Sequence, residues 1–154
     1  MKRINDTTIS INGKQILIVP SAKDAKDIVN LPWKDLDIDI VLDTTGKFTK
    51  HEDLNNHIIA GAKKVVLSAP GKGDKFKTAT FVPGVNSQDY KADIDVISAA
   101  SCTTNGLTPA LKVLQDVFGI DAASFTTTHS VTASQYVLDK RAKKPERGRA
   151  TKNT

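Results

Sequence analysis

Cys102 is the only cysteine of the 154-residue chain, and its sequence neighbours suit nucleophilic chemistry. A β-branched run, residues 94–98, precedes it, and an apolar run with helical spacing, residues 107–118, follows it. A thiol where a strand gives way to a helix faces the positive end of the helix dipole, which favours the nucleophilic thiolate. Small hydroxyl residues flank the cysteine and can donate hydrogen bonds to an anion. A lone cysteine is usually a small buried hydrophobe. A second reactive group is therefore needed to indicate that Cys102 is a nucleophile.

His129 supplies that second group, because it follows another strand-like run, residues 123–128. An imidazole can take the proton of a thiol near neutral pH. A histidine at a strand end is more often a structural residue, but the nearby cysteine motif reverses that expectation. The two residues together indicate covalent catalysis by a thiol activated by a base.

The motif Ser-Cys-Thr-Thr-Asn at 101–105 and the motif Thr-Thr-His-Ser-Val-Thr at 127–132 resemble the active site of phosphorylating glyceraldehyde-3-phosphate dehydrogenase. The resemblance runs through nearly the whole chain. It implies oxidative phosphorylation of glyceraldehyde 3-phosphate to 1,3-bisphosphoglycerate, with NAD, inorganic phosphate and a Cys102 thioester. His129 would be the base and would then hold the oxyanion. The resemblance further implies substrate and phosphate contacts from Ser101, Thr103, Thr132 and Arg147, and cofactor contacts from Lys23, Thr45, Gly46 and Ser68.

The chain also departs from the family pattern. It shows no counterpart of the glycine-rich phosphate loop or of most of the catalytic domain, so we expect an internal fragment with weak cofactor binding. A catalytically inactive remnant is therefore the alternative to an active enzyme. Three questions stay open: whether the chain uses NADP, whether it is a relative that acts as an erythrose-4-phosphate dehydrogenase, and whether it assembles into the family's homotetramer.

The sequence around these residues predicts an α/β fold. Strand-like runs at 38–42 and 64–68 enclose a helical run, 50–60, which predicts a parallel strand–helix–strand unit. Asn12-Gly13 between two β-rich runs predicts a hairpin. Pro109 is tolerable in the first turn of a helix, which predicts that the last helix begins close to Cys102.

By resemblance, the parallel unit is part of a doubly wound, Rossmann-like sheet, and the first strand and loop of a second, α+β catalytic domain follow it. We expect residues 1–101 to be an incomplete dinucleotide-binding domain and residues 102–154 to be the start of the catalytic domain. His51 and His57 lie six residues apart with no completing ligands, so we expect surface residues and no metal site.

The net charge of +5 equals the excess of basic over acidic residues in segment 139–154 alone. A nucleic-acid-binding module is the alternative function from another class, but no aromatic residues interleave with these charges to stack on bases. A solvated end of the chain is the simpler interpretation. We expect no membrane association, because no apolar run is long enough to span a bilayer. A single cysteine favours a reducing compartment, and we expect the cytoplasm.

Overall fold

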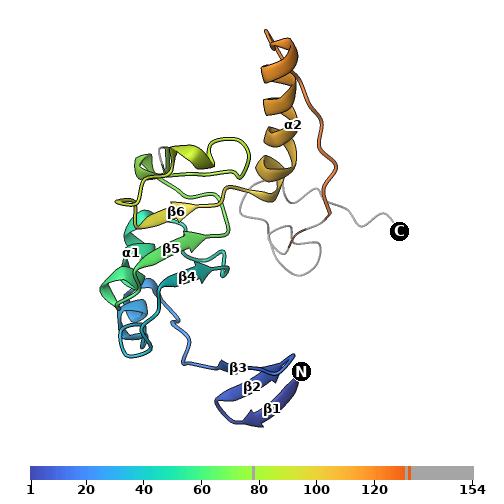
Figure 1. Ribbon diagram of the computed structural model, residues 1–154. Coiled ribbons are helices and arrows are strands. Elements are labelled where there is room, and N and C mark those ends of the chain that lie inside the picture. Colours follow the sequence, from blue (N-terminus) through green and yellow to red (C-terminus); the bar gives the residue numbers. More distant parts are fainter. Residues whose placement is uncertain (78, 131, 133–154) are drawn as a thin grey trace, which may run out of the picture. The chain divides into compact units, whose positions relative to one another are not determined.

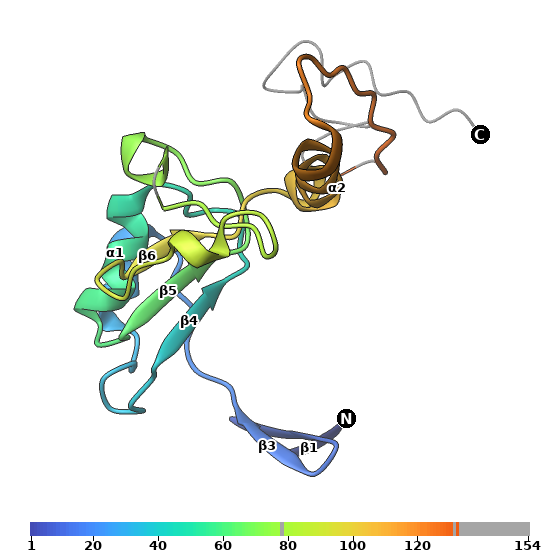
Figure 2. The same cartoon turned by 45° about the horizontal axis from the view of Figure 1, so that its top comes forward.

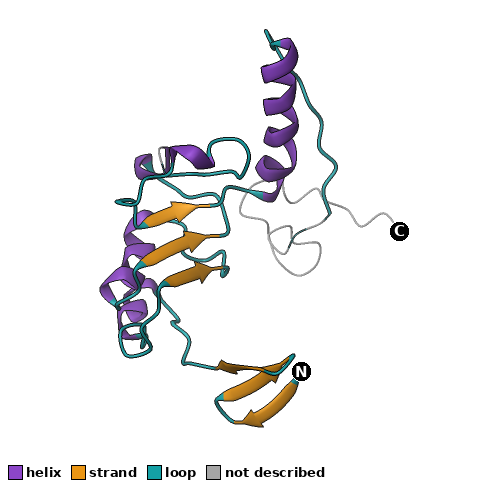
Figure 3. Ribbon diagram, viewed as in Figure 1, coloured by secondary structure: helices purple, strands orange, loops and turns teal. Residues whose placement is uncertain are grey.

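The computed structural model describes residues 1–77, 79–130 and 132 of the chain. It divides into two compact units, Met1–Ile120 and Asp121–Thr154, which we consider separately. The regular elements among the described residues all belong to the first unit (Figure 1, Figure 3). They are β1 (Lys2–Asn5), β2 (Thr8–Ile11), β3 (Lys14–Leu17), η1 (Ala25–Asn30), β4 (Ile40–Asp43), α1 (His51–Ile59), β5 (Lys64–Leu67), η2 (Asp74–Lys77), η3 (Ser87–Asp89), β6 (Val96–Ser98) and α2 (Cys102–Phe118), where η marks a 3₁₀ helix.

Strands β1, β2 and β3 form an antiparallel sheet in sequence order. The turn between β2 and β3 holds Asn12 at φ 49° and Gly13 at φ 81°. Positive φ at both central residues suits the right-handed twist of a two-residue hairpin, and asparagine and glycine reach it at the lowest cost. The predicted hairpin is confirmed.

Strands β4, β5 and β6 form a parallel sheet in that order, with α1 as the crossover between β4 and β5. Side chains alternate across the sheet. Val41, Val65 and Val96 lie on the buried face, which α1 covers (Figure 2), and η1 packs against α1. The predicted strand–helix–strand unit is thus confirmed as part of an α/β fold.

The opposite face of β4 is open. Ile40 and Leu42 are 57% and 66% exposed, because β4 is the edge strand and alternate residues point away from the α1 side. The core lies on the closed face and is continuous from η1 through α1 to the sheet. It consists of Ile28, Phe48, Leu54, Val65, Leu67, Phe76, Ala79 and Val96.

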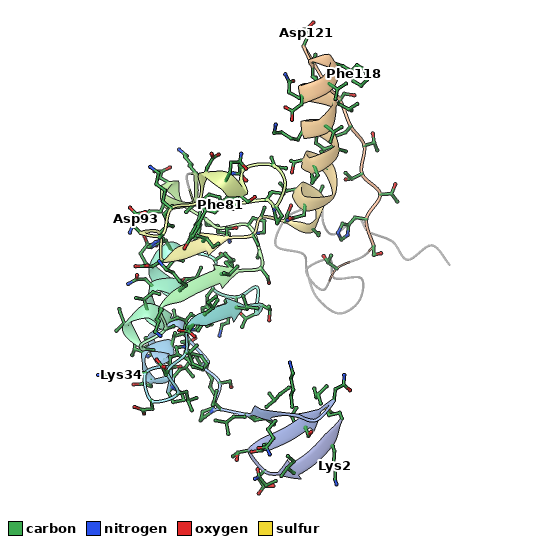
Figure 4. All side chains as sticks on the ribbon, viewed as in Figure 1. Lys2, Lys34, Phe81, Asp93, Phe118 and Asp121 are labelled. Atoms are coloured by element: carbon green, nitrogen blue, oxygen red, sulfur yellow. The ribbon has the colours of Figure 1, made fainter. Side chains whose placement is uncertain are left out.

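The last helix begins earlier than its apolar spacing predicts. It starts at Cys102, so Pro109 lies well inside α2 and not in its first turn. The predicted helix start close to Cys102 is confirmed, but the placement of Pro109 in the first turn was wrong, because a capping side chain, described below, sets the start of the helix. No residue of α2 is buried, and Phe118 projects from its last turn at 78% exposure (Figure 4).

The strand predicted at 123–128 is also absent, since residues 121–130 are described without regular structure. An alternating sequence becomes a strand only when a neighbouring strand takes up its backbone hydrogen bonds, and among the described residues none does so here.

Candidate active site

The turn between β6 and α2 is built around one buried hydroxyl. The side chain of Ser98 has no exposed surface, and its Oγ donates to the carbonyl oxygen of Ala69 at 2.7 Å. The same Oγ accepts from the backbone N–H of Ala100 at 3.1 Å. Ala100 has φ 61°, a left-handed conformation that is costly for a residue with a Cβ. The hydrogen bonds to Ser98 therefore offset the backbone strain at Ala100, in the turn that leads from β6 into α2.

Two side chains then fix the first turn of α2. Ser101 is the N-cap, and its Oγ accepts from the backbone N–H of Thr104 at 3.0 Å. The Nδ2 of Asn105 donates back to the carbonyl oxygens of Ala99 (2.7 Å) and Ser101 (2.9 Å). These contacts tie both sides of Cys102 into one rigid corner.

Cys102 is thus the first residue of α2, and it is exposed. It lies just beyond the carboxyl end of β6, the edge at which open parallel sheets bind their ligands. The first turn of α2 contains no acidic residue, so the positive end of the helix acts on the thiol without an opposing carboxylate there. This environment favours the thiolate, as the sequence predicts.

His129 belongs to the second unit and is exposed. Its Nδ1 lies 2.7 Å from the carbonyl oxygen of Ser130. A carbonyl oxygen only accepts, so Nδ1 carries the proton and the lone pair of the neutral ring is on Nε2. That tautomer is able to act as a base. Because Cys102 lies in the other unit, the pairing of thiol and imidazole remains a prediction.

The other predicted substrate residues divide between the two units. Ser101 and Thr103 are partly buried and flank Cys102, and the hydroxyl of Ser101 also serves the cap. Thr132 is exposed in the second unit. Arg147 lies outside the described residues.

The predicted cofactor residues meet at the carboxyl ends of β4 and β5. Oδ1 of Asp43 accepts from both the backbone N–H (2.9 Å) and the hydroxyl (2.7 Å) of Thr45. The N–H of Ser68 donates to the backbone carbonyl of Asp43 at 3.0 Å. Gly46 follows with φ 64°, a conformation that glycine adopts without strain.

Lys23 reaches the same place through Lys47, the residue after Gly46, whose Nζ donates to the carbonyl oxygen of Lys23. A cavity of about 460 Å³ opens beside this corner. Its walls include Val19–Ala22, β4, Thr45 and Phe48. A mostly apolar hollow beside a strand-to-turn corner suits one part of a dinucleotide.

Sequence reasoning missed one group. His57 is 5% exposed, so its prediction as a surface residue was wrong. Its Nδ1 accepts from the indole N–H of Trp33 at 2.9 Å, and its Nε2 lies 3.6 Å from Oδ2 of Asp43. Burial lowers the pKa of His57, and the Asp43 carboxylate opposes that shift. The spacing of three residues from buried Leu54 is the signal that could have placed His57 on the inner face of α1.

Comparison with known proteins identifies the family. The family model of the glyceraldehyde 3-phosphate dehydrogenase C-terminal domain matches residues 101–154, beginning at the cap of α2. Glyceraldehyde-3-phosphate dehydrogenase of Chlamydia pneumoniae is 54% identical over 124 residues, which are 80% of this chain and 36% of the relative. Over the length that it spans, this chain belongs to the glyceraldehyde-3-phosphate dehydrogenase family.

Chloroplastic relatives in this family match as well. The Chondrus crispus protein is 50% identical over 135 residues, which are 87% of this chain and 31% of the relative. Glyceraldehyde-3-phosphate dehydrogenase A of Zea mays is 46% identical over 150 residues, which are 97% of this chain and 36% of the relative. The chain thus spans about a third of the length of these relatives.

Within the described residues, no cluster of three histidine, cysteine or carboxylate side chains could hold a metal ion. No helix in that part of the chain is long and apolar enough to cross a bilayer.

Proposed function

We propose that the chain carries the thiol–imidazole machinery of a phosphorylating glyceraldehyde-3-phosphate dehydrogenase, which converts glyceraldehyde 3-phosphate to 1,3-bisphosphoglycerate in glycolysis. The observation that supports this most directly is an exposed cysteine at the first position of a capped helix, beside the carboxyl end of a parallel sheet.

In this proposal the Cys102 thiolate attacks the aldehyde carbon. The S–C bond forms while the carbonyl electron pair moves to oxygen, and His129 takes the thiol proton on Nε2. The backbone N–H of Cys102 and the protonated ring of His129 then stabilise the oxyanion. Inorganic phosphate finally attacks the Cys102 thioester, the C–S bond breaks, and the product leaves as an acyl phosphate.

Oxidation of the aldehyde carbon needs a hydride acceptor, and a nicotinamide dinucleotide, when bound, would supply it. Lys23, Thr45, Gly46 and Ser68 are our candidates to hold NAD, with NADP as the other choice. These residues gather at the carboxyl edge of the parallel sheet, next to the cavity. Polar groups at that edge and the apolar cavity beside it could together contact one part of a dinucleotide. This assignment treats the sheet as part of a Rossmann-like dinucleotide-binding domain, residues 1–101, with the catalytic domain starting at residue 102.

Anionic groups of the substrates need donors around Cys102. We assign this role to the hydroxyls of Ser101, Thr103 and Thr132 and to the guanidinium of Arg147, because charge-assisted bonds to phosphate are short and strong. A nucleophilic thiol has to stay reduced, so we place the protein in a reducing compartment, with the cytoplasm as our proposal.

The test is turnover by the full chain. With NAD, inorganic phosphate and glyceraldehyde 3-phosphate, we expect NADH to form at 340 nm, a wavelength characteristic of reduced nicotinamide. Cys102→Ser should abolish that signal, and omitting phosphate should stop it after one equivalent. Running erythrose 4-phosphate and NADP in parallel decides the substrate and the cofactor. Absence of turnover together with a reactive Cys102 would favour the inactive remnant.

A further inference from the structure

A line of four side chains connects the core to the turn that we assign to the cofactor. It runs from Trp33 to His57 on α1, then to Asp43 at the end of β4, and finally to Thr45. We call it the Trp33–Thr45 chain. The side chains of His57 and Asp43 are 7% and 2% exposed, so both titratable groups lie inside the protein. The chemistry proposed above uses neither of them.

The hydrogen-bond pattern fixes the proton on His57. An indole N–H can only donate, so Nδ1 of His57 is an acceptor and the proton of the neutral ring sits on Nε2. That Nε2 is buried and has no hydrogen-bond partner, since Oδ2 of Asp43 lies 3.6 Å away. A buried donor left unsatisfied beside a carboxylate is uncommon in a folded protein and destabilises this arrangement.

The far end of the Trp33–Thr45 chain is the cofactor turn. Oδ1 of Asp43 accepts both the N–H and the hydroxyl of Thr45, the residue that leads into Gly46 at φ 64°. A single carboxylate therefore faces His57 with one oxygen and holds the turn with the other. A movement of the carboxylate toward His57 changes both bonds to Thr45.

Adding a proton to His57 changes both of its contacts. Protonated Nδ1 becomes a donor that faces the indole N–H, so the bond from Trp33 is lost. The charged ring also attracts Oδ2 of Asp43, and 3.6 Å leaves room for the two to close to a charge-assisted hydrogen bond. We propose that His57 is a proton-sensitive positioning residue, which sets the geometry of the Thr45–Gly46 turn through Asp43 and releases Trp33 when it is protonated.

Few charged groups influence the protonation of His57. Asp43 on β4 is the charged group that raises the pKa of His57, and burial, the larger effect, lowers it. Asp27 on η1, Lys34 beside Gly61 and Asp53 on α1 belong to the elements packed around His57, and none contributes to this shift. The transition is therefore expected below the ordinary histidine value of about 6.5.

The experiment is an NMR pH titration of the full chain without cofactor or substrate. Trp33 is the only tryptophan, so its indole N–H gives a single resolved signal. We expect this signal and the backbone amide of Thr45 to shift with one shared midpoint below pH ~6.5. A Thr45 amide that stays fixed, or that moves with a different midpoint, would overturn the inference.

Three variants sharpen the result. His57→Gln can still accept from Trp33 and donate to Asp43 but cannot titrate in this range, so both transitions should vanish. His51→Gln is the matched control on the same helix and should leave them unchanged. Trp33→Phe removes a bond that favours neutral His57, so the midpoint seen at Thr45 should rise, and a fall would contradict the proposal.

The assignment of the turn to a cofactor rests on the proposed function, but the titration does not. A chain that shows the shared midpoint yet no turnover would refute the enzyme proposal alone. A chain that turns over without any Thr45 response would refute this inference alone. If a variant fails to fold, the titration of the unaltered chain still decides.

Discussion

Removing the cap of α2 tests how the structure holds Cys102. In Ser101→Ala the backbone N–H of Thr104 loses its 3.0 Å partner, while the backbone of the turn stays the same. Loss of a capping hydroxyl costs about 1 kcal/mol. None of the 17 residues of α2 is buried, so little packing compensates for that loss.

A cost of about 1 kcal/mol corresponds to a roughly fivefold change in the opening equilibrium of the first helical turn. Native-state hydrogen exchange at the amide of Thr104 should therefore become about fivefold faster. Because fraying removes Cys102 from the helix N-terminus, its alkylation by iodoacetamide at neutral pH should also slow. Ser101→Thr keeps a capping hydroxyl and should change both rates far less.

A second control separates local from global effects. Ser21→Ala removes an exposed hydroxyl in the segment before η1 and should leave the exchange of Thr104 unaltered. Unchanged exchange at Thr104 in Ser101→Ala would refute the argument that this hydroxyl sets the start of α2. Faster exchange with an unchanged alkylation rate would show that the helix terminus does not activate the thiol.

Three further outcomes are expected. Leu54→Ala removes a fully buried side chain and should lower the free energy of unfolding in urea by about 2–5 kcal/mol, whereas Leu114→Ala, at 46% exposure, should cost far less. The pKa of His57 is lower in the folded chain, so the unfolded chain binds more protons as the pH falls below about 6.5. The free energy of unfolding should therefore decrease as the pH falls. Urea titrations of His57→Gln should show a weaker decrease. The iodoacetamide rate at Cys102 should reach half its maximum below pH ~8.5, and His129→Gln should slow it at neutral pH if the imidazole takes the thiol proton; a rate that ignores this substitution would count against the pair.

Local signals in the sequence predicted several elements correctly. Asn12-Gly13 specifies its turn because positive φ is a property of the residues themselves. The apolar runs around α1 predicted β4 and β5 within two residues at each end, because apolar β-branched residues favour strands, although the structure leaves one face of β4 open. The start of α2 close to Cys102 was predicted correctly, but the apolar spacing alone begins at Leu107, five residues after the first helical residue, because apolar spacing marks only where side chains meet a core.

The proposed nucleophile and its proposed chemistry were predicted from the sequence alone, because the motif around Cys102 is a pattern of neighbouring residues. Only the tertiary structure decided the polar interior. Trp33 lies in a turn, His57 on α1 and Asp43 on β4, and nothing in their local sequence specifies that burial brings them together. The same distinction applies to Thr45. Its sequence context indicates an ordinary turn residue, and only the fold places its hydroxyl against Asp43. Local propensity acts over a few residues, whereas the protonation and orientation of a buried group depend on whatever the rest of the chain packs around it.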